Sequence, residues 1–193
     1  MNNPLNLKKV LKLSYDDNIN NQQSIKKNGY NFDSKLSNKN EKVYYNPNQN
    51  KLLVSVAGTH NFKDVLTDAY LGAGKLKDTT RYKQAHKTIR EAKNKYNVES
   101  ATLAGHSLGG SIVSYAGSKN DTIYTLDKGA TIGTKTRPRE KAYRNKGDVV
   151  SLLSSNSKNM KTFGKTDYLR NGLIKGSLKA HDVKNIQSLK IFI

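Results

Sequence analysis

The chain has 193 residues, no cysteine, and 34 Lys and Arg residues against 15 Asp and Glu residues, which give a formal net charge of +19. This length fits one domain with a single core, and the lack of cysteine excludes disulfide bonds, cysteine-bound metal and thiol chemistry. The charge favours contact with anionic surfaces such as phospholipid head groups or nucleic acid, although a solvated lysine-rich surface explains it equally well. No run approaches the ~20 apolar residues of a membrane span, and residues 1–21 lack the apolar region of a signal peptide, so we expect a soluble protein.

The chain begins with a polar, asparagine-rich arm over residues 1–41. Apolar residues between 5 and 13 predict one short amphipathic helix, and residues 16–40 have a loop-like pattern. We expect this arm to belong to the same domain as residues 42–193 and to cover it. The main part of the domain is assigned to residues 42–193.

The elements of residues 42–193 alternate between strands and helices. Residues 42–57 predict a β-hairpin with its turn at 46–50. Apolar residues at three- and four-residue steps predict a helix over 79–96. Further strands are predicted at 101–104, 122–126 and 142–144, and a helix runs from the turn at 105–110 to about residue 117. This order predicts an α/β fold with a mostly parallel sheet and helices on both faces.

Gly105-His106-Ser107-Leu108-Gly109 matches the pattern G-x-S-x-G, between a predicted strand and a predicted helix. In this motif the serine lies on a sharp strand-to-helix turn with a strained backbone, and side chains at the two glycine positions would clash with the neighbouring strand or helix. The N-terminus of the following helix favours developing negative charge. We therefore predict Ser107 as the nucleophile of a minimal α/β-hydrolase; the alternative is a Gly/Ser-rich turn without chemistry.

A serine nucleophile needs a base and an acid, which on this fold follow it in the order acid, then histidine. His181 is the only histidine after Ser107, so it is the predicted base. Asp148 is the first choice for the acid, because it lies on a loop at the C-terminal end of a predicted strand, where ligands bind in open α/β sheets. Asp127, which ends a strand, is the second choice, ahead of Asp121, Glu140 and Asp167.

The oxyanion hole of this fold takes one backbone N–H from the residue after the nucleophile and one from the loop after an earlier strand. Leu108 is the first donor. Thr59 is the candidate for the second, because strand 52–57 ends in Gly58-Thr59 and Gly58 lets the backbone approach the substrate. An ordinary turn explains Gly58 and Thr59 equally well.

Together these segments resemble the class 3 lipase family, which contains the fungal triacylglycerol lipases. The resemblance is carried by Val56–Thr59 with Asp64–Asp68, by Gly105–Gly110, by Asn145–Val150 and by Ala180–Val183. It implies hydrolysis of carboxyl esters with no metal or organic cofactor. Since the charge of +19 fits an anionic phospholipid surface, we expect a lipase or phospholipase that acts on lipid esters. The resemblance also implies a lid over residues 60–76. Family members often have an arginine where this chain has Ala57, and they are usually longer.

The Lys- and Asn-rich composition is similar to that of proteins from AT-rich genomes, including large DNA viruses, which suggests a virion or host cytoplasm. A different class of function is a non-catalytic basic module of the same fold that binds anionic membranes or nucleic acid. The clusters Lys8-Lys9 with Lys12, and Lys26-Lys27, favour it. Because no strand combines aromatic and basic residues in the pattern that stacks bases, we expect no nucleic acid as partner.

Overall fold

A computed structural model of the chain describes residues 4–60, 76–129, 137–148, 150, 160–163, 179–185 and 190–193. In this part of the chain seven strands form one sheet, in the order β1-β2-β3-β4-β5-β6-β7. The first three pair antiparallel, and they are β1 (Asn31–Phe32), β2 (Glu41–Asn46) and β3 (Lys51–Val56). The rest continue from β3 in parallel, and they are β4 (Ala101–His106), β5 (Thr122–Leu126), β6 (Glu140–Asn145) and β7 (Lys161–Phe163).

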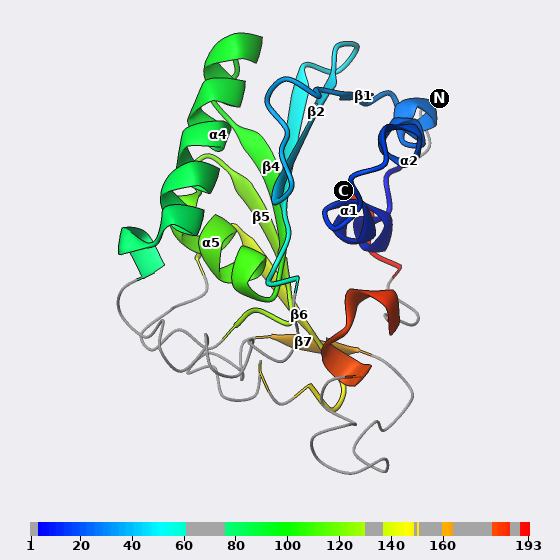
Figure 1. Cartoon of the computed structure of the whole chain (residues 1–193), viewed down its shortest axis with the longest axis vertical. Coiled ribbons are helices and arrows are strands. Elements are labelled where there is room, and N and C mark those ends of the chain that lie inside the picture. The colour runs from blue at the N-terminus through cyan, green and yellow to red at the C-terminus, as the bar shows by residue number, and fades with distance from the viewer. Residues whose placement is uncertain are drawn as a thin grey trace.

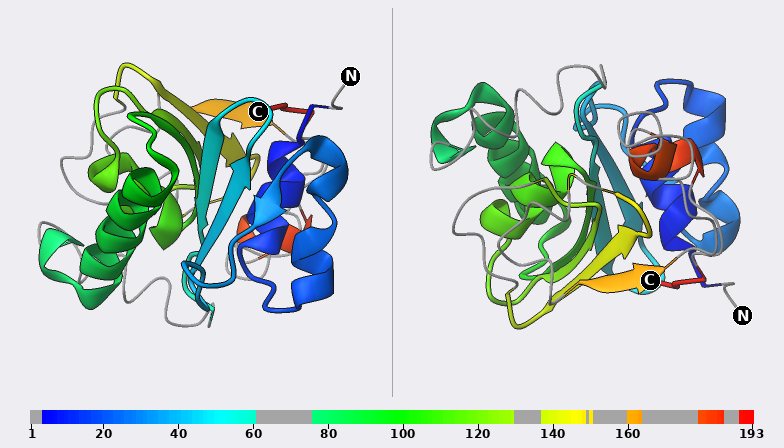
Figure 2. Two further views of the ribbon diagram at one scale, coloured as in Figure 1. Left: turned by 90° about the horizontal axis from the view of Figure 1, so that it is seen from above. Right: turned by 90° about the horizontal axis from the view of Figure 1, so that it is seen from below.

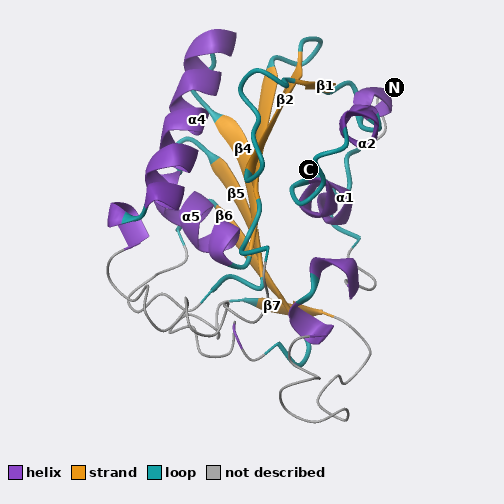
Figure 3. Cartoon of the chain, in the orientation of Figure 1, coloured by secondary structure: helices purple, strands orange, loops and turns teal. Residues whose placement is uncertain are grey.

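Helices cover both faces of this sheet, as Figures 1 and 3 show. One face carries α4 (Thr80–Tyr96) and α5 (Leu108–Ala116), and the other carries α1 (Leu7–Leu13) and α2 (Ile19–Gln23). The views from above and below in Figure 2 show the same three layers. The predicted α/β fold, with a mostly parallel sheet between two helical layers, is therefore confirmed.

The core divides at the sheet, because successive side chains of a strand point to opposite faces. On β3, Leu52 and Val54 join the apolar cluster under α4 and α5, whereas Leu53 between them joins the cluster under the N-terminal arm. α4 supplies a matching apolar stripe: its Ala85, Ile89 and Ala92 are buried, as the periodicity of residues 79–96 predicts.

The N-terminal arm supplies one whole layer of this core. Leu7, Val10 and Leu11 of α1 are fully buried. The arm is also hydrogen-bonded to the other end of the chain: the Leu7 N–H donates to the Ile191 carbonyl at 2.9 Å, and the Ile193 N–H donates to the Leu5 carbonyl at 2.9 Å.

The loop predicted for residues 16–40 is partly wrong, because this stretch contains α2, the 3-10 turn η1 (Lys26–Asn28) and β1. These elements have two to five residues each, too few for a repeating apolar pattern to show. Two further 3-10 turns are η2 (Leu76–Asp78) and η5 (Val183–Asn185). Within the described residues, no helix combines the length and apolar character needed to cross a bilayer.

Candidate active site

Ser107 is the single residue between β4 and α5, and its backbone has a conformation that L-residues rarely adopt. Its φ is 55° and its ψ is −127°, a strained combination that costs on the order of 1–3 kcal/mol and persists only where neighbours enforce it. Those neighbours are backbone groups: the Ser107 N–H donates to Leu126 O at 3.0 Å, and the Ser107 carbonyl accepts from Ser111 N and Gly129 N, each at 3.2 Å. The predicted sharp, strained turn is thus confirmed.

The two glycines of the motif are required by close backbone contacts. A Cβ added at Gly105 would lie 2.4 Å from Gly109 O, and one added at Gly109 would lie 2.1 Å from Val56 O. The first collision is with the following helix and the second is with the neighbouring strand β3, as expected from the motif. Since every atom met is backbone, no side-chain rotation could relieve either clash.

The structure brings Ser107, His181 and Asp148 together in one hydrogen-bonded chain. His181 Nε2 lies 2.7 Å from Ser107 Oγ, and His181 Nδ1 lies 2.9 Å from Asp148 Oδ1. All three residues are buried, and they come from the turn after β4, the loop after β6 and a helical segment near the C-terminus. If Nδ1–H is donated to the carboxylate, Nε2 carries no proton and faces the serine hydroxyl, which is the tautomer that nucleophilic catalysis requires.

The loop after β3, predicted to carry an oxyanion donor, lies directly against the serine. A Cβ at Gly58 would be 2.8 Å from Ser107 Cβ and 2.8 Å from His106 O, so the backbone of this loop approaches as closely as glycine permits. Thr59 follows at once and is half-buried, and Leu108 is the first residue of α5. Both predicted donors therefore belong to segments that border Ser107.

Asp127 directly follows β5 and adopts a positive φ of 47°. Its carboxyl group accepts from Asn145 N at 2.6 Å and Asn145 Nδ2 at 3.2 Å, whereas the two ring nitrogens of His181 are engaged by Ser107 and Asp148. Burial, and then the negative charge of Asp148, raise the pKa of Asp127 well above its ordinary value. The raised pKa favours the protonated form of Asp127 beside Asp148.

The other acids considered from the sequence lie elsewhere. Asp121 accepts from Ala101 N at 2.8 Å, and Glu140 is paired with Lys128 at 2.7 Å. Asp167 and most of the predicted lid, residues 61–75, lie outside the described residues.

Possible metal ligands lie close together in one place among the described residues. The ligand atoms of His106, Asp127 and His181 are all within 4.8 Å of one another. The ring nitrogens of His106 are bonded to Tyr15 Oη and His181 O, and those of His181 to Ser107 and Asp148. A metal ion would have to break these bonds, so the donor set fits a hydrogen-bond network better than a metal centre.

The fold is similar to that of a lipase–propeptide complex from Rhizomucor miehei, with a TM-score of 0.51 and 14% sequence identity, over 80% of this chain and 62% of that chain. The chain has a lipase-like α/β-hydrolase fold. The Lip2 lipase from Yarrowia lipolytica is also similar, with a TM-score of 0.46 and 14% identity over 77% of this chain and 73% of that one. The chain thus spans about three fifths of the Rhizomucor protein. No protein-family model and no curated protein sequence matches it.

The predicted resemblance to the fungal lipases is confirmed at the level of the fold. One departure from the family pattern has a structural counterpart: Ala57 stands where an arginine is common, and Arg81 of α4 donates to the Ala57 carbonyl at 2.7 Å. Arg81 therefore brings a guanidinium to the end of the β3 segment from a different element. No local pattern around Arg81 indicates this contact.

Sequence reasoning gave no role to three more residues next to the site, Asn145, Tyr15 and His106. Asn145 Nδ2 donates to the Ala180 carbonyl at 2.8 Å and so holds the segment that carries His181. Tyr15 reaches the turn at Ser107, the nucleophile elbow, from the N-terminal arm and bonds His106 Nδ1 at 2.6 Å. His106 occupies a variable position of the motif, and Tyr15 lies outside every motif, so spacing alone could not identify them.

Proposed function

We propose that this protein is a serine hydrolase that cleaves carboxyl esters of lipids, as a lipase or phospholipase. Ser107 is the nucleophile, His181 the general base and Asp148 the acid that orients the imidazole. The proposal depends on one observation: a buried Ser–His–Asp chain with bonds of 2.7 and 2.9 Å begins at a serine in a strained turn. Such a chain is recognised by its geometry and roles rather than by sequence position.

In the proposed reaction, Ser107 Oγ attacks the ester carbonyl carbon while His181 Nε2 takes the hydroxyl proton. Negative charge then develops on the carbonyl oxygen, and the N–H groups of Leu108 and Thr59 bind it. The tetrahedral intermediate breaks its C–O bond to the alcohol, which leaves with the proton from His181. Water, deprotonated by the same imidazole, then attacks the acyl-serine. The second tetrahedral intermediate breaks its C–O bond to Ser107 Oγ, which takes the proton back from His181, and the carboxylic acid is released. Every proton is accounted for without a cofactor.

Two observations support a lipid ester as the substrate class. The chain has the fold of proteins that are named as lipases, and its formal net charge of +19 attracts it to anionic phospholipid surfaces. Neither observation favours one scissile ester bond, so lipase and phospholipase activities belong to the same proposal.

A fluorophosphonate probe and a short-chain nitrophenyl ester test this function directly. We expect the probe to label the wild-type protein at Ser107, and Ser107→Ala or His181→Ala to lower kcat by roughly 10⁶-fold, with little further loss when both are changed. Ser100→Ala, at an exposed serine, is the matched control and should behave as wild type. Wild-type protein that neither labels nor hydrolyses, with or without detergent, would contradict the proposal.

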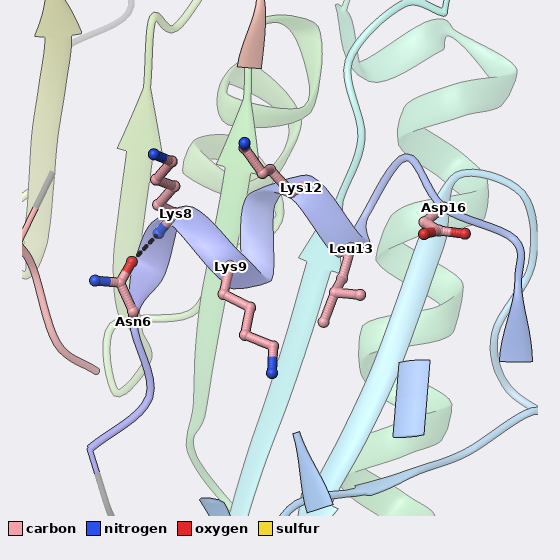
Figure 4. A pocket seen from close by; sticks show the side chains of 6 residues that line it. All are labelled: Asn6, Lys8, Lys9, Lys12, Leu13 and Asp16. Carbon is pink, nitrogen blue, oxygen red and sulfur yellow. Dashed lines mark hydrogen bonds between the residues drawn. The ribbon is translucent and has the colours of Figure 1, made fainter. Parts of the chain in front are cut away.

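A second candidate function is binding to an anionic surface through the outer side of α1. Figure 4 shows Lys8, Lys9 and Lys12 around a hollow of about 340 Å³, together with Asp16. The opposite side of α1 is buried, so these lysines project away from the core. Clustered lysines near a membrane contribute about 1 kcal/mol each to binding of anionic lipid.

Sedimentation with phosphatidylserine vesicles tests the α1 surface. Changing Lys8 and Lys12 to Gln should weaken binding by roughly 10-fold or more at low salt, because two cations are lost. Changing Lys83 and Lys87, two exposed lysines of α4, is the control for total charge. If both pairs weaken binding equally, overall charge rather than this surface is responsible.

A further inference from the structure

The Tyr15 hydroxyl joins two parts of the site that are far apart in the sequence. Tyr15 follows α1, and its Oη accepts from the Gly58 N–H at 2.8 Å and bonds His106 Nδ1 at 2.6 Å. A Cβ at Gly58 would lie 2.7 Å from this same oxygen, so the glycine is what allows the phenol to fit. Burial of the phenol raises the pKa of Tyr15, which therefore keeps its proton.

The direction of each hydrogen bond follows from the groups involved. A backbone N–H can only donate, so Tyr15 Oη accepts from Gly58 and has its one proton left for His106 Nδ1. The other ring nitrogen, His106 Nε2, lies 2.8 Å from the His181 carbonyl oxygen, which can only accept. Burial, and then the neighbouring His181, lower the pKa of His106 to about 3, so the ring is neutral with its single proton on Nε2. In this chain of hydrogen bonds, which we call the relay, every donor has one acceptor.

The relay therefore runs from Gly58 N–H through Tyr15 O–H and His106 to the backbone carbonyl of His181. Gly58 immediately precedes Thr59, whose N–H is the proposed oxyanion donor, and the other end holds the proposed general base. Because the Gly58 N–H is used by Tyr15, the proposed oxyanion donor of this loop is the next backbone N–H, that of Thr59. Both proposed functional groups thus depend on one phenol.

We propose that Tyr15 is a positioning residue that aligns the oxyanion loop with His181, so that the N-terminal arm is part of the active site. This inference rests on the proposed hydrolase function. Tyr15→Phe removes one oxygen and leaves the Gly58 N–H and His106 Nδ1 buried without their shared partner. A shift of about 1 Å in reacting groups costs about 100-fold in rate, so we expect kcat to fall by about 100-fold while KM stays within about threefold.

The experiment compares Tyr15→Phe with wild type in ester hydrolysis and in binding of two inhibitors. A trifluoromethyl ketone, which forms an oxyanion with the serine, should bind the variant about 100-fold more weakly, in step with the loss in kcat. A non-reactive ether analogue of the ester should bind both proteins equally. Tyr45→Phe is the matched control, because the Tyr45 hydroxyl bonds Asn50 at 2.8 Å at the tip of the β2–β3 hairpin.

A merely structural role for Tyr15 would weaken both inhibitors alike or neither of them, and either result overturns the inference. If Tyr15→Phe does not fold, His106 carries the test. His106→Gln keeps an amide that can accept from Tyr15 Oη and donate to the His181 carbonyl, so it should retain more of the relay than His106→Leu, which offers neither group. Equal kcat for these two variants overturns the inference. Wild-type protein that fails to label at Ser107 overturns the hydrolase function first, so the two failures are distinguishable.

Discussion

Lys128 and Glu140 form a buried ion pair beneath α5. We predict that breaking this pair substantially lowers the free energy of unfolding. Both side chains are 0% exposed, and Lys128 Nζ lies 2.7 Å from Glu140 Oε1. The carboxylate also accepts from Ser114 Oγ at 2.6 Å, Thr125 Oγ1 at 3.0 Å and Arg137 N at 3.2 Å. The pair is therefore fully hydrogen-bonded, and neither charge has access to water if its partner is removed.

Lys128→Met keeps most of the side-chain volume, so the expected cost comes from the charge left on Glu140 rather than from a cavity. Removing one partner of a buried ion pair costs about 3–5 kcal/mol, because the remaining charge stays desolvated. The three other hydrogen bonds of Glu140 place our expectation near the lower end, about 3 kcal/mol. Adding Glu140→Gln should restore part of this loss, since the second change removes the uncompensated charge.

Urea unfolding at pH 7, followed by circular dichroism, measures these free energies, with an unchanged m-value as the check on two-state behaviour. The control is Lys87→Met, which breaks an exposed pair with Glu91 at 3.8 Å and should change stability by less than about 0.5 kcal/mol. A cost below about 1 kcal/mol for Lys128→Met would refute the reasoning, since it would mean that the buried carboxylate is stable without its cation.

Three further predictions concern the site itself. Asp148→Asn should lower kcat by about 10⁴-fold, whereas Asp127→Asn should keep most of the activity; ester hydrolysis by the two variants decides which carboxyl orients His181. Because the folded-state pKa of Asp127 is raised above its unfolded value, its contribution to stability is complete below about pH 4 and is lost as pH rises through the folded pKa. The melting temperature of Asp127→Asn minus that of the wild type should therefore be larger at pH 9 than at pH 5. The same difference at both pH values would contradict this prediction. Gly109→Ala should cost about 3 kcal/mol or more and abolish labelling of Ser107, because its Cβ would lie 2.1 Å from Val56 O; a folded, active variant would show that β3 can move.

The sequence predicts the parts of this fold whose signal is local. Residues 42–57 contain two apolar runs around a turn, and they form β2 and β3 in the predicted antiparallel pairing. Residues 79–96 place apolar side chains on one helical face, and α4 covers Thr80–Tyr96. The elbow is predicted best of all, because its glycines are required by contacts within the motif and with the adjacent strand.

Elements with two or three residues could not be predicted in the same way. β1 and β7 occupy the two edges of the sheet, and each is a strand only because its neighbour provides hydrogen-bond partners. Their residues show no repeat long enough to distinguish a strand from a loop. For the same reason, the sequence could place the centre of the sheet but not its width.

Sequence spacing alone does not decide whether Asp148 or Asp127 pairs with His181. Both residues follow a predicted strand, and the parallel sheet brings the ends of β5 and β6 to the same edge. Which carboxyl reaches His181 depends on how the C-terminal segment crosses that edge. Asn145 fixes this path by binding both Asp127 and the Ala180 carbonyl, a contact that spans 35 residues and leaves no trace in local sequence.

The N-terminal arm and the C-terminal segment both contact the nucleophile elbow, so both stabilise the site. Tyr15 comes from the N-terminal arm and His181 from the C-terminal segment, and both bond the ring of His106. The same two ends are joined to each other by the backbone bonds of Leu7 with Ile191 and of Leu5 with Ile193. Local opening of either end would therefore release a partner of His106, so opening free energies of the arm and of the C-terminal segment should be similar to each other and coupled to activity. The proposed general base is thus held in place by contacts with the N-terminal arm as well as by its own segment, and the layer of core contributed by α1 anchors that arm.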